Sequence, residues 1–319
     1  MQVAEGIYQI SLPLPFPLRV VHVYLLRDGA GWTCVDTGLN YGAGREAWQA
    51  AFQALEIDVR AIHRIVLTHA HPDHYGLAGW LSQQCGAEVL LSGIEYAFVQ
   101  ATWLSEGELQ HAAARFFEEY GMPADLAAIV DQDIAELRAM TQPAPSMQLI
   151  EAGMQLEIGT RHFELMHTPG HSDGHLVLYC AAERLMLCGD AVLTKITPNV
   201  GLWSWGEANP LAHFLRSLNM LARVEVDLAL PGHGPLIRNF AQRLGELAAH
   251  HEERLELIKQ CAGTGIDAYS ICTRVFPVQE LSSHQIRFAM AETLAHLVYL
   301  EDIGQLRRSD DAIPLFYRR

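Results

Sequence analysis

The sequence contains few basic residues, and this argues against one class of partner. Its 319 residues include 22 Lys and Arg against 37 Asp and Glu, which gives a formal net charge of −15. Proteins that bind nucleic acids usually carry clustered Lys and Arg, which displace counterions from the phosphates, and no such run is present. An acidic chain also repels a polyanion at long range. DNA or RNA is therefore not expected as the main partner, although a single local basic patch would be enough to serve RNA.

Cysteine pairs and long apolar runs are also missing. The six cysteines are far apart and form no C-x-x-C pair, so we expect no disulfide framework. The sequence has no run of about 18 apolar residues, which a membrane-spanning helix would need. The segment from Met1 to Glu5 lacks the basic start and apolar stretch of a secretory signal. With 50% hydrophobic and 18% charged residues, the chain reads as a globular protein, and we expect it in the cytoplasm without membrane contact.

Segments typical of strands and of helices alternate along the chain, and this alternation predicts an α/β fold. Residues 94–140 change to an almost purely helical pattern, which is too long for a plain connection and predicts a helical insertion. Strands then return until about residue 230. Helices are predicted over residues 238–261, 267–276 and 283–300, followed by a small hairpin over 304–316. We expect one domain over residues 1–237 and a C-terminal helical domain over 238–319.

The segment from Thr68 to His74 carries the strongest chemical signal. It reads THAHPDH, and it follows an apolar strand. Imidazole and carboxylate groups are the ligands that suit zinc, iron and manganese. His69 and His71 point to the same face of an extended segment, because side chains alternate along it. Pro72 ends the extension, so Asp73 and His74 begin a helix. The two pairs can therefore serve two adjacent metal ions.

Three later segments have the same character. Each places a His or Asp just beyond a predicted strand, beside a glycine that allows close backbone approach. They are the HTPGH segment that ends at His171, the CGD segment that ends at Asp190, and the PGHG segment that contains His233. Each signal is weak alone. Together with the THAHPDH segment they predict a dinuclear metal site.

The order H-x-H-x-D-H, G-H, G-D, G-H-G over about residues 5–240 resembles the metallo-β-lactamase-fold superfamily. The resemblance implies a four-layer αβ/βα sandwich that carries the helical insertion. It also implies two divalent metal ions, with zinc expected first and iron or manganese as alternatives. One ion would be held by His69, His71 and His171, the second by Asp73, His74 and His233, and Asp190 would bridge them.

The same resemblance implies an enzymatic function. Two adjacent metals can share a water and lower its pKa, and the resulting hydroxide attacks a carbonyl or phosphoryl centre. Asp73 would ligate one metal and also orient the hydroxide or carry its proton, which makes it the candidate catalytic residue. Asp36 matches an aspartate that lies behind the family's ligands. An equally good interpretation from the sequence is that it caps a turn.

The C-terminal part is similar to the lactamase-β-like-2 group, which includes a single-strand endoribonuclease, and its helix order resembles that group's winged-helix-like tail. Glyoxalase II enzymes share all the metal ligands. The tail carries little excess positive charge, so a lid or a homodimer surface is the simpler interpretation. We also expect His250 and His251, in the middle of a helix, to be exposed.

A small carboxylic ester, thioester or lactone is the expected substrate. The alternatives are an endoribonuclease-like phosphodiesterase, a sulfur dioxygenase with a single iron, and a ligand sensor without catalysis. The expected pocket residues follow the metal-ligand segments in the chain, where loops lie near the metals. They are Tyr75, Asn199, Trp203 and Trp205.

Overall fold

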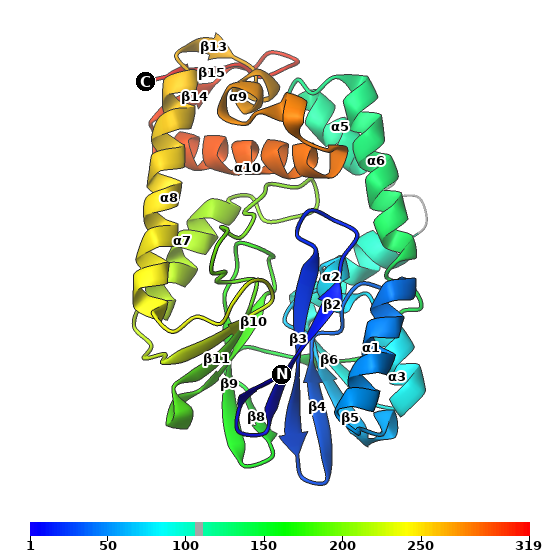
Figure 1. Ribbon diagram of the computed structural model, residues 1–319. Helices are drawn as coiled ribbons and strands as arrows, with labels where there is room; N and C mark the ends of the chain where they lie inside the picture. Colours follow the sequence, from blue (N-terminus) through cyan, green and yellow to red (C-terminus); the bar gives the residue numbers. More distant parts are fainter. Residues whose placement is uncertain (106–110) are drawn as a thin grey trace.

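Two β-sheets face each other in the lower half of the structure, with helices on their outer faces and further helices across one end (Figure 1). The structure is a computed structural model that describes residues 1–105 and 111–319. Positions 106–110, in the expected insertion, lie outside the described residues. The four-layer αβ/βα arrangement expected from the sequence is confirmed.

The first sheet has the order β1-β2-β3-β4-β5-β6-β7. Neighbouring strands are antiparallel from β1 to β4 and parallel from β4 to β7. The parallel part suits strands that alternate with helices along the chain. The strands are β1 (Gln2–Ala4), β2 (Ile7–Pro13), β3 (Val20–Asp28), β4 (Gly31–Val35), β5 (Ile62–Val66), β6 (Glu88–Ser92) and β7 (Met147–Ile150).

The second sheet has the order β12-β11-β10-β9-β8, and only its β11–β12 pair is parallel. A third, small sheet near the C-terminus has the order β13-β15-β14. The strands of the second sheet are β8 (Gln155–Ile158), β9 (Arg161–His167), β10 (Leu176–Cys180), β11 (Leu185–Gly189) and β12 (Leu228–Pro231). Those of the third are β13 (Thr264–Ile266), β14 (Leu306–Arg308) and β15 (Phe316–Arg318).

Successive side chains of each strand point to opposite faces of the sheet, and this alternation creates the layers of the fold. In β3, the buried side chains of Val23 and Leu25 face the helices outside the first sheet. Their neighbours Tyr24 and Leu26 face the opposite way, into the core between the sheets. In the second sheet, Leu178 of β10 and Leu187 of β11 lie in that same inner core. Both faces of each sheet are therefore covered, which explains the largely apolar strands.

Helices cover the outer faces of both sheets. The helices α1 and α3 lie beside the first sheet, and α7 and α8 lie beside the second (Figure 1). Their bounds, with those of the short segments nearby, are α1 (Gly42–Ala54), η1 (Val59–Ala61), α2 (Pro72–Tyr75), α3 (Ala78–Cys85), η3 (Ala181–Glu183), α7 (Pro210–Leu221) and α8 (Phe240–Cys261). None of the helices within residues 1–105 and 111–319 combines the length and apolar character that a membrane crossing requires.

The expected helical insertion is present, and it shares a core with the C-terminal helices. Phe117 and Val130 of the insertion lie in the same buried cluster as Met290 and Leu294 of α10. In Figure 1, α10 crosses above the two sheets between α8 and the insertion. The bounds in these regions are α4 (Gly93–Phe98), the π-helical segment η2 (Val99–Leu104), α5 (Ala112–Glu119), α6 (Ala124–Ala139), α9 (Ala268–Val275), η4 (Val278–Glu280) and α10 (Ser283–Asp302).

Local sequence explains where α10 begins. The Ser282 side chain accepts a hydrogen bond from the backbone N–H of Gln285, whose own side chain reaches back to the Ser282 backbone. This reciprocal capping satisfies two N–H groups that a helix start leaves free. It also fixes the first two turns of α10, which carry His284, Arg287 and Phe288.

Two expectations about the tail need correction. The expected exposure of His251 is wrong: its side chain is only 1% exposed, because α8 packs against α7 and α10. Its Nδ1 lies 3.1 Å from Nε2 of His296 in α10. His250 is partly buried. The hairpin expected over residues 304–316 is present as β14 and β15, but β13, which joins it, is not predicted by the sequence pattern.

Candidate metal centre

The seven side chains selected as ligands from the sequence lie together at one end of the two sheets. Each follows the carboxyl end of a strand: β5, β9, β11 or β12. Potential ligand atoms within 4.8 Å of one another form three overlapping groups. These groups are His69 with His71 and His171, His69 with His74 and Asp190, and Asp73 with His74 and His233.

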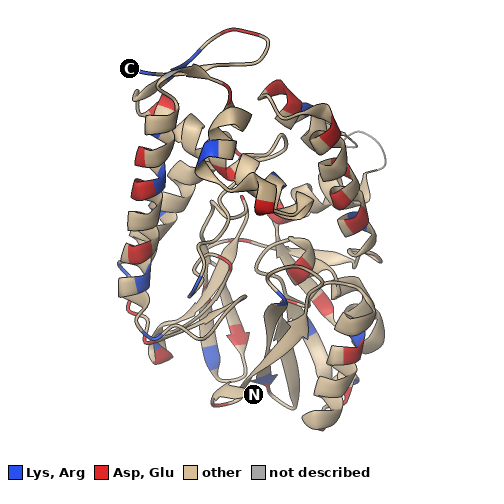
Figure 2. Ribbon diagram, turned by 45° about the horizontal axis from the view of Figure 1, so that its top comes forward, with Lys and Arg blue, Asp and Glu red and all other residues tan. Residues whose placement is uncertain are grey.

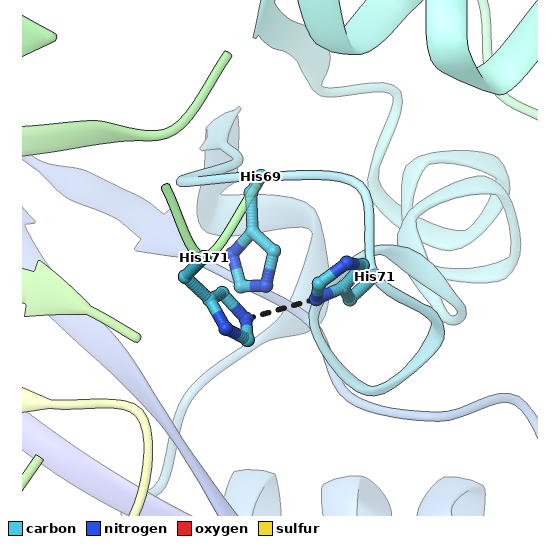
Figure 3. Close-up of side chains that lie close together, drawn as sticks. All are labelled: His69, His71 and His171. Atoms are coloured by element: carbon cyan, nitrogen blue, oxygen red, sulfur yellow. Dashed lines mark hydrogen bonds between the residues drawn. The ribbon is translucent and has the colours of Figure 1, made fainter. Parts of the chain in front are cut away.

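Three histidines form one side of the cluster, and their rings turn toward a common point (Figure 3). Nδ1 of His71 lies 2.9 Å from Nε2 of His171. The ring of His69 lies against both, with centroids 4.6 Å from His71 and 5.0 Å from His171. Three imidazole nitrogens are thus brought together by two segments that are about 100 residues apart.

Asp190 lies between the two sides of the cluster. Its Oδ2 is 3.7 Å from Nε2 of His171 and 3.4 Å from Nε2 of His233. Its Oδ1 is 3.4 Å from Nε2 of His74. On the far side, Oδ2 of Asp73 lies 3.2 Å from Nε2 of His233. The carboxylate of Asp190 therefore reaches both histidine groups.

Backbone carbonyls orient two of the histidines. Nδ1 of His171 donates to the carbonyl oxygen of Asn199 at 2.9 Å, and Nδ1 of His233 donates to that of Val20 at 2.7 Å. A carbonyl oxygen can only accept, so each ring carries its proton on Nδ1. In the neutral form of each ring, Nε2, which faces the cluster, then keeps its lone pair.

Asp36 orients two further rings, those of His74 and His69. Its carboxylate accepts hydrogen bonds from Nδ1 of His74 at 2.8 Å and from the Thr68 hydroxyl at 2.8 Å. Since that hydroxyl gives its proton to Asp36, it accepts from Nδ1 of His69 at 3.0 Å. Asp36 adopts a left-handed backbone conformation with φ of 60°, which Asp tolerates better than most residues. Asp36 therefore lies behind the cluster, as expected. Its hydrogen-bond network leaves Nε2 of both rings free.

Several inward-facing atoms have no partner among the described residues. Nε2 of His69, His74 and His233 and Oδ1 of Asp190 are buried without a hydrogen bond. Leaving a buried polar atom unpaired typically costs about 1–3 kcal/mol, so such a concentration needs an explanation. Imidazole nitrogens and carboxylates around one point are a donor set for divalent transition metals. The residues therefore fit a metal centre.

Burial and charge divide the cluster electrostatically. Burial, together with neighbouring histidines, lowers the pKa of His69 well below its usual value and that of His71 to about 3. Burial alone would also lower the pKa of His74, but Asp190 and Asp36 raise it well above the usual value. Burial opposes ionisation of Asp190, yet His233 and His74 keep its pKa well below the usual range. Neutral His69 and His71 and ionised Asp190 are the states that ligate metals.

Glu95 was not identified from the sequence, and its carboxylate connects the loop that carries His71 to the loop that carries His171. Its Oε2 accepts from the backbone N–H of Ala70 at 2.7 Å, and its Oε1 from that of Gly174 at 2.8 Å. Burial raises the pKa of Glu95, and these N–H groups counteract that effect. The only signal in the sequence is Ser92 three residues earlier, a helix-start pattern that does not reveal where the carboxylate points.

His175 was missed as well. It is fully buried, and its Nε2 accepts from the backbone N–H of Asp190 at 3.1 Å. Its Nδ1 lies 3.0 Å from the hydroxyl of Thr168. His175 therefore holds the Asp190 loop in place instead of facing the cluster. Its position four residues after His171 was the available signal.

A cavity of about 330 Å³ opens beside the cluster and is lined by Asp73, Asp190 and His233 on that side. Asn199, Trp203 and Trp205 also line it, and the two tryptophan rings stack with centroids 5.4 Å apart. Tyr75 lies elsewhere: its side chain is fully buried in the core beside the first sheet, so the expected pocket position does not apply to it.

The carboxyl group of Glu292 in α10 lies behind Asn199, and its side chain is 12% exposed. Burial raises its pKa from 4.5 to about 7, although Arg254 and Asn199 offset part of this rise. The folded protein thus binds this proton more tightly than the unfolded chain does. The contribution of protonated Glu292 to the free energy of unfolding is fully present below the pKa that this group has in the unfolded chain. It is lost as the pH rises through the pKa that the group has in the folded protein.

We expect Glu292→Gln to abolish this loss of stability at rising pH, because the amide is neutral at every pH. Relative to wild type, the variant should gain about 2 kcal/mol of unfolding free energy between about pH 5 and pH 8. Urea unfolding of the metal-loaded protein, followed by tryptophan fluorescence, measures this difference. Glu252→Gln on the exposed face of α8 is the matched control. An equal pH dependence in both variants would contradict the prediction.

Comparisons with known proteins agree with this geometry. The chain is 26% identical over 306 residues to the probable metallo-hydrolase YqjP of Bacillus subtilis, covering 93% of this chain and 92% of the relative. It superposes on a metallo-beta-lactamase family protein from Thermus thermophilus with a TM-score of 0.91 and 34% identity over 100% of both chains. A beta-lactamase domain protein from Burkholderia ambifaria gives a TM-score of 0.88 at 33% identity, over 100% of this chain and 94% of that one.

Family models locate the likeness within the chain. A model described as the metallo-beta-lactamase-like C-terminal domain matches residues 255–318. A model described as the metallo-beta-lactamase superfamily matches residues 17–233, which contain all seven side chains of the cluster. The protein therefore belongs to the metallo-beta-lactamase superfamily.

Proposed function

We propose that this member of a superfamily of metallo-hydrolases cleaves a small carboxylic ester, thioester or lactone at a centre of two divalent metal ions. One observation carries the proposal. The buried, inward-facing Nε2 atoms of His69, His74 and His233 lack partners beside an apolar cavity, whereas their Nδ1 atoms are held from outside.

Two groups of side chains would hold the ions. His69, His71 and His171 form one group, and Asp73, His74 and His233 form the other. Asp190 would bridge them, because its two oxygens face nitrogens from both groups. Two bound cations of this kind lower the pKa of a water molecule and polarise a carbonyl oxygen. We expect zinc first, with iron or manganese as alternatives.

Asp73 is suited to handle a proton at this centre. Its Oδ2 lies 3.2 Å from Nε2 of His233, and the residue also lines the cavity. Burial opposes its ionisation, but His74 and His233 hold its pKa well below the usual range, so the carboxylate is available as an acceptor. In the proposed reaction it orients the attacking water and carries its proton toward the leaving group.

The walls of the cavity support a small, partly apolar substrate. Phe98 and Trp103 of the insertion, Leu193 and Trp203 after Asp190, and Phe288 of α10 supply apolar surface. Arginines gather on the C-terminal hairpin of β14 and β15, near the end marked C (Figure 2). They are Arg307, Arg308, Arg318 and Arg319, and none of them lines the cavity. Among the described residues that line the cavity, Arg287 alone is Lys or Arg. This distribution does not favour a phosphodiester polyanion.

Metal analysis and a hydrolysis panel on one sample test the proposal. The panel contains thioesters, lactones, aryl esters, a phosphodiester and a single-stranded RNA. We expect about two zinc ions per chain and turnover of the carboxylic substrates only. One iron per chain without hydrolysis would contradict the proposal in favour of an oxygenase. Cleavage of RNA alone would contradict the argument from charge.

A further inference from the structure

Arg287 is a buried cation that forms no ion pair with any of the described residues. The residue is 6% exposed, and it lines the cavity beside the cluster. Within the described part of the chain, no carboxylate lies within 4.0 Å of its guanidinium nitrogens. Its Nε is buried without a hydrogen-bond partner. A buried charge is strongly unfavourable unless it is paired, so the position of Arg287 calls for a partner that the described residues do not supply.

The neighbours of Arg287 hold its guanidinium in place without neutralising it. One terminal nitrogen, Nη2, lies 3.0 Å from Nδ1 of His284, and Cζ lies 4.5 Å from the centre of the Phe288 ring. The ring of His284 in turn stacks on Phe16, with centroids 4.5 Å apart. Burial lowers the pKa of Arg287 to about 10, and the more distant carboxylates of Asp133 and Asp73 act in the opposite direction. Arg287 therefore stays charged at neutral pH.

We infer that the substrate carries a carboxylate at the end of its apolar part, an inference that rests on the proposed function. Arg287 binds this carboxylate while the ester group of the same molecule lies at the metal centre. Arg287 shares one cavity with Asp73, Asp190 and His233, so a single small molecule can reach both. Guanidinium groups bind carboxylates through strong, charge-assisted hydrogen bonds. The apolar walls of the cavity fit the part of the substrate between its carboxylate and its ester group.

The charge around the cavity favours a carboxylate over a phosphate. One guanidinium faces the same space as the carboxylates of Asp73 and Asp190. A single negative charge is matched by Arg287, whereas a doubly charged phosphate would leave one charge unpaired between the apolar walls of the cavity. His284 adds no positive charge at neutral pH, because burial beside Arg287 lowers its pKa to about 3.

Paired substrates test this inference on the metal-loaded enzyme. Mono-4-nitrophenyl esters of dicarboxylic acids with four to eight carbons are compared with the nitrophenyl esters of the matching monocarboxylic acids. The readout is the ratio of kcat/KM for the acid-tailed over the neutral-tailed ester. We expect wild type to prefer the acid tail at one chain length, and Arg287→Met to lower the ratio by about 30-fold. Arg287→Lys should restore most of it.

A matched control removes another arginine of the C-terminal domain. Arg307→Met takes away a guanidinium that stacks on Tyr317 outside the cavity, and it should keep the wild-type ratio. Circular dichroism and metal content verify that each variant is folded and loaded. The inference is overturned if Arg287→Met keeps the wild-type ratio, or if wild type prefers the neutral tail at every length.

Binding separates this inference from the proposed hydrolysis. Tryptophan fluorescence follows binding of monomethyl adipate and of dimethyl adipate to wild type and to Arg287→Met. We expect the variant to weaken binding of the monomethyl ester by at least about 10-fold, and the dimethyl ester by much less. A carboxylate held only by the metals would bind wild type and variant equally, which overturns the inference. If no ester is hydrolysed but Arg287→Met still weakens binding of the monomethyl ester more than that of the dimethyl ester, the proposed function alone is contradicted.

Discussion

Substituting Ala for Asp190 is expected to lower the metal content from about two ions per chain to one or fewer. The same change should reduce kcat/KM by at least about 100-fold, since even residues that only support a ligand commonly contribute 10- to 100-fold. Asp190 supplies the negative charge between the two histidine groups, within 3.7 Å of a nitrogen from each. Without it, Asp73 would be the one carboxylate left in the cluster to balance two divalent cations in a buried site.

Elemental analysis after dialysis against a weak chelator measures this effect. Asp190→Asn tests charge at nearly constant shape, and it should lose the second ion as well. Asp227→Ala, whose side chain is 72% exposed, is the matched control and should retain both ions. Two tightly bound metals in Asp190→Ala would refute the proposed bridge.

Substituting Ala for Glu95 is expected to lower the free energy of unfolding by about 4 kcal/mol, because it leaves two buried backbone N–H groups without an acceptor. These groups belong to Ala70 and Gly174, which lie in the loops that carry His71 and His171. Loss of Glu95 should therefore separate the loops and weaken metal retention together with stability.

Urea unfolding of metal-free protein isolates the effect on folding. Glu95→Gln should lose about half as much, since its amide keeps one acceptor oxygen but turns an NH₂ group toward the other N–H. Glu118→Ala, on the exposed face of α5, should change stability by less than about 0.5 kcal/mol. A loss below about 1 kcal/mol in Glu95→Ala would show that water or the loops themselves satisfy the two N–H groups.

The alternation of strand and helix patterns predicted an α/β fold, and the family resemblance implied its four-layer arrangement. The residues of the cluster were predicted for a physical reason. The cluster residues His69, His171, Asp190 and His233 sit in short polar segments directly after apolar strands, and strands of one orientation end at the same edge of a sheet. The structure brings these side chains together as the pattern indicates. Their role as metal ligands is a proposal that the Asp190 variants test.

Residues whose partners are distant in sequence escaped prediction. Glu95 binds two backbone groups, and no side-chain pattern marks such a partner. Arg287 reaches the cavity only because α10 crosses the end of the sheets, which local periodicity does not reveal. His251 was misplaced for a related reason: α8 packs on two neighbours, so its buried face is wider than a single apolar stripe. The strands β7 and β13 are too short for alternation to show.

The cavity is assembled from parts of two mechanical kinds. Its floor, with Asp190 and His233, is fixed to strand ends of the second sheet, where each change disturbs the core shared by the two sheets. Its roof, with Phe98, Arg287 and Phe288, belongs to the helices α4 and α10, which lie outside both sheets. Roof residues can therefore vary in size and charge while the reaction centre keeps its geometry. A scaffold built in this way can acquire new substrates by changes at the cavity-facing positions of α4 and α10, while Glu95 of α4 keeps its contacts with the loops of the cluster.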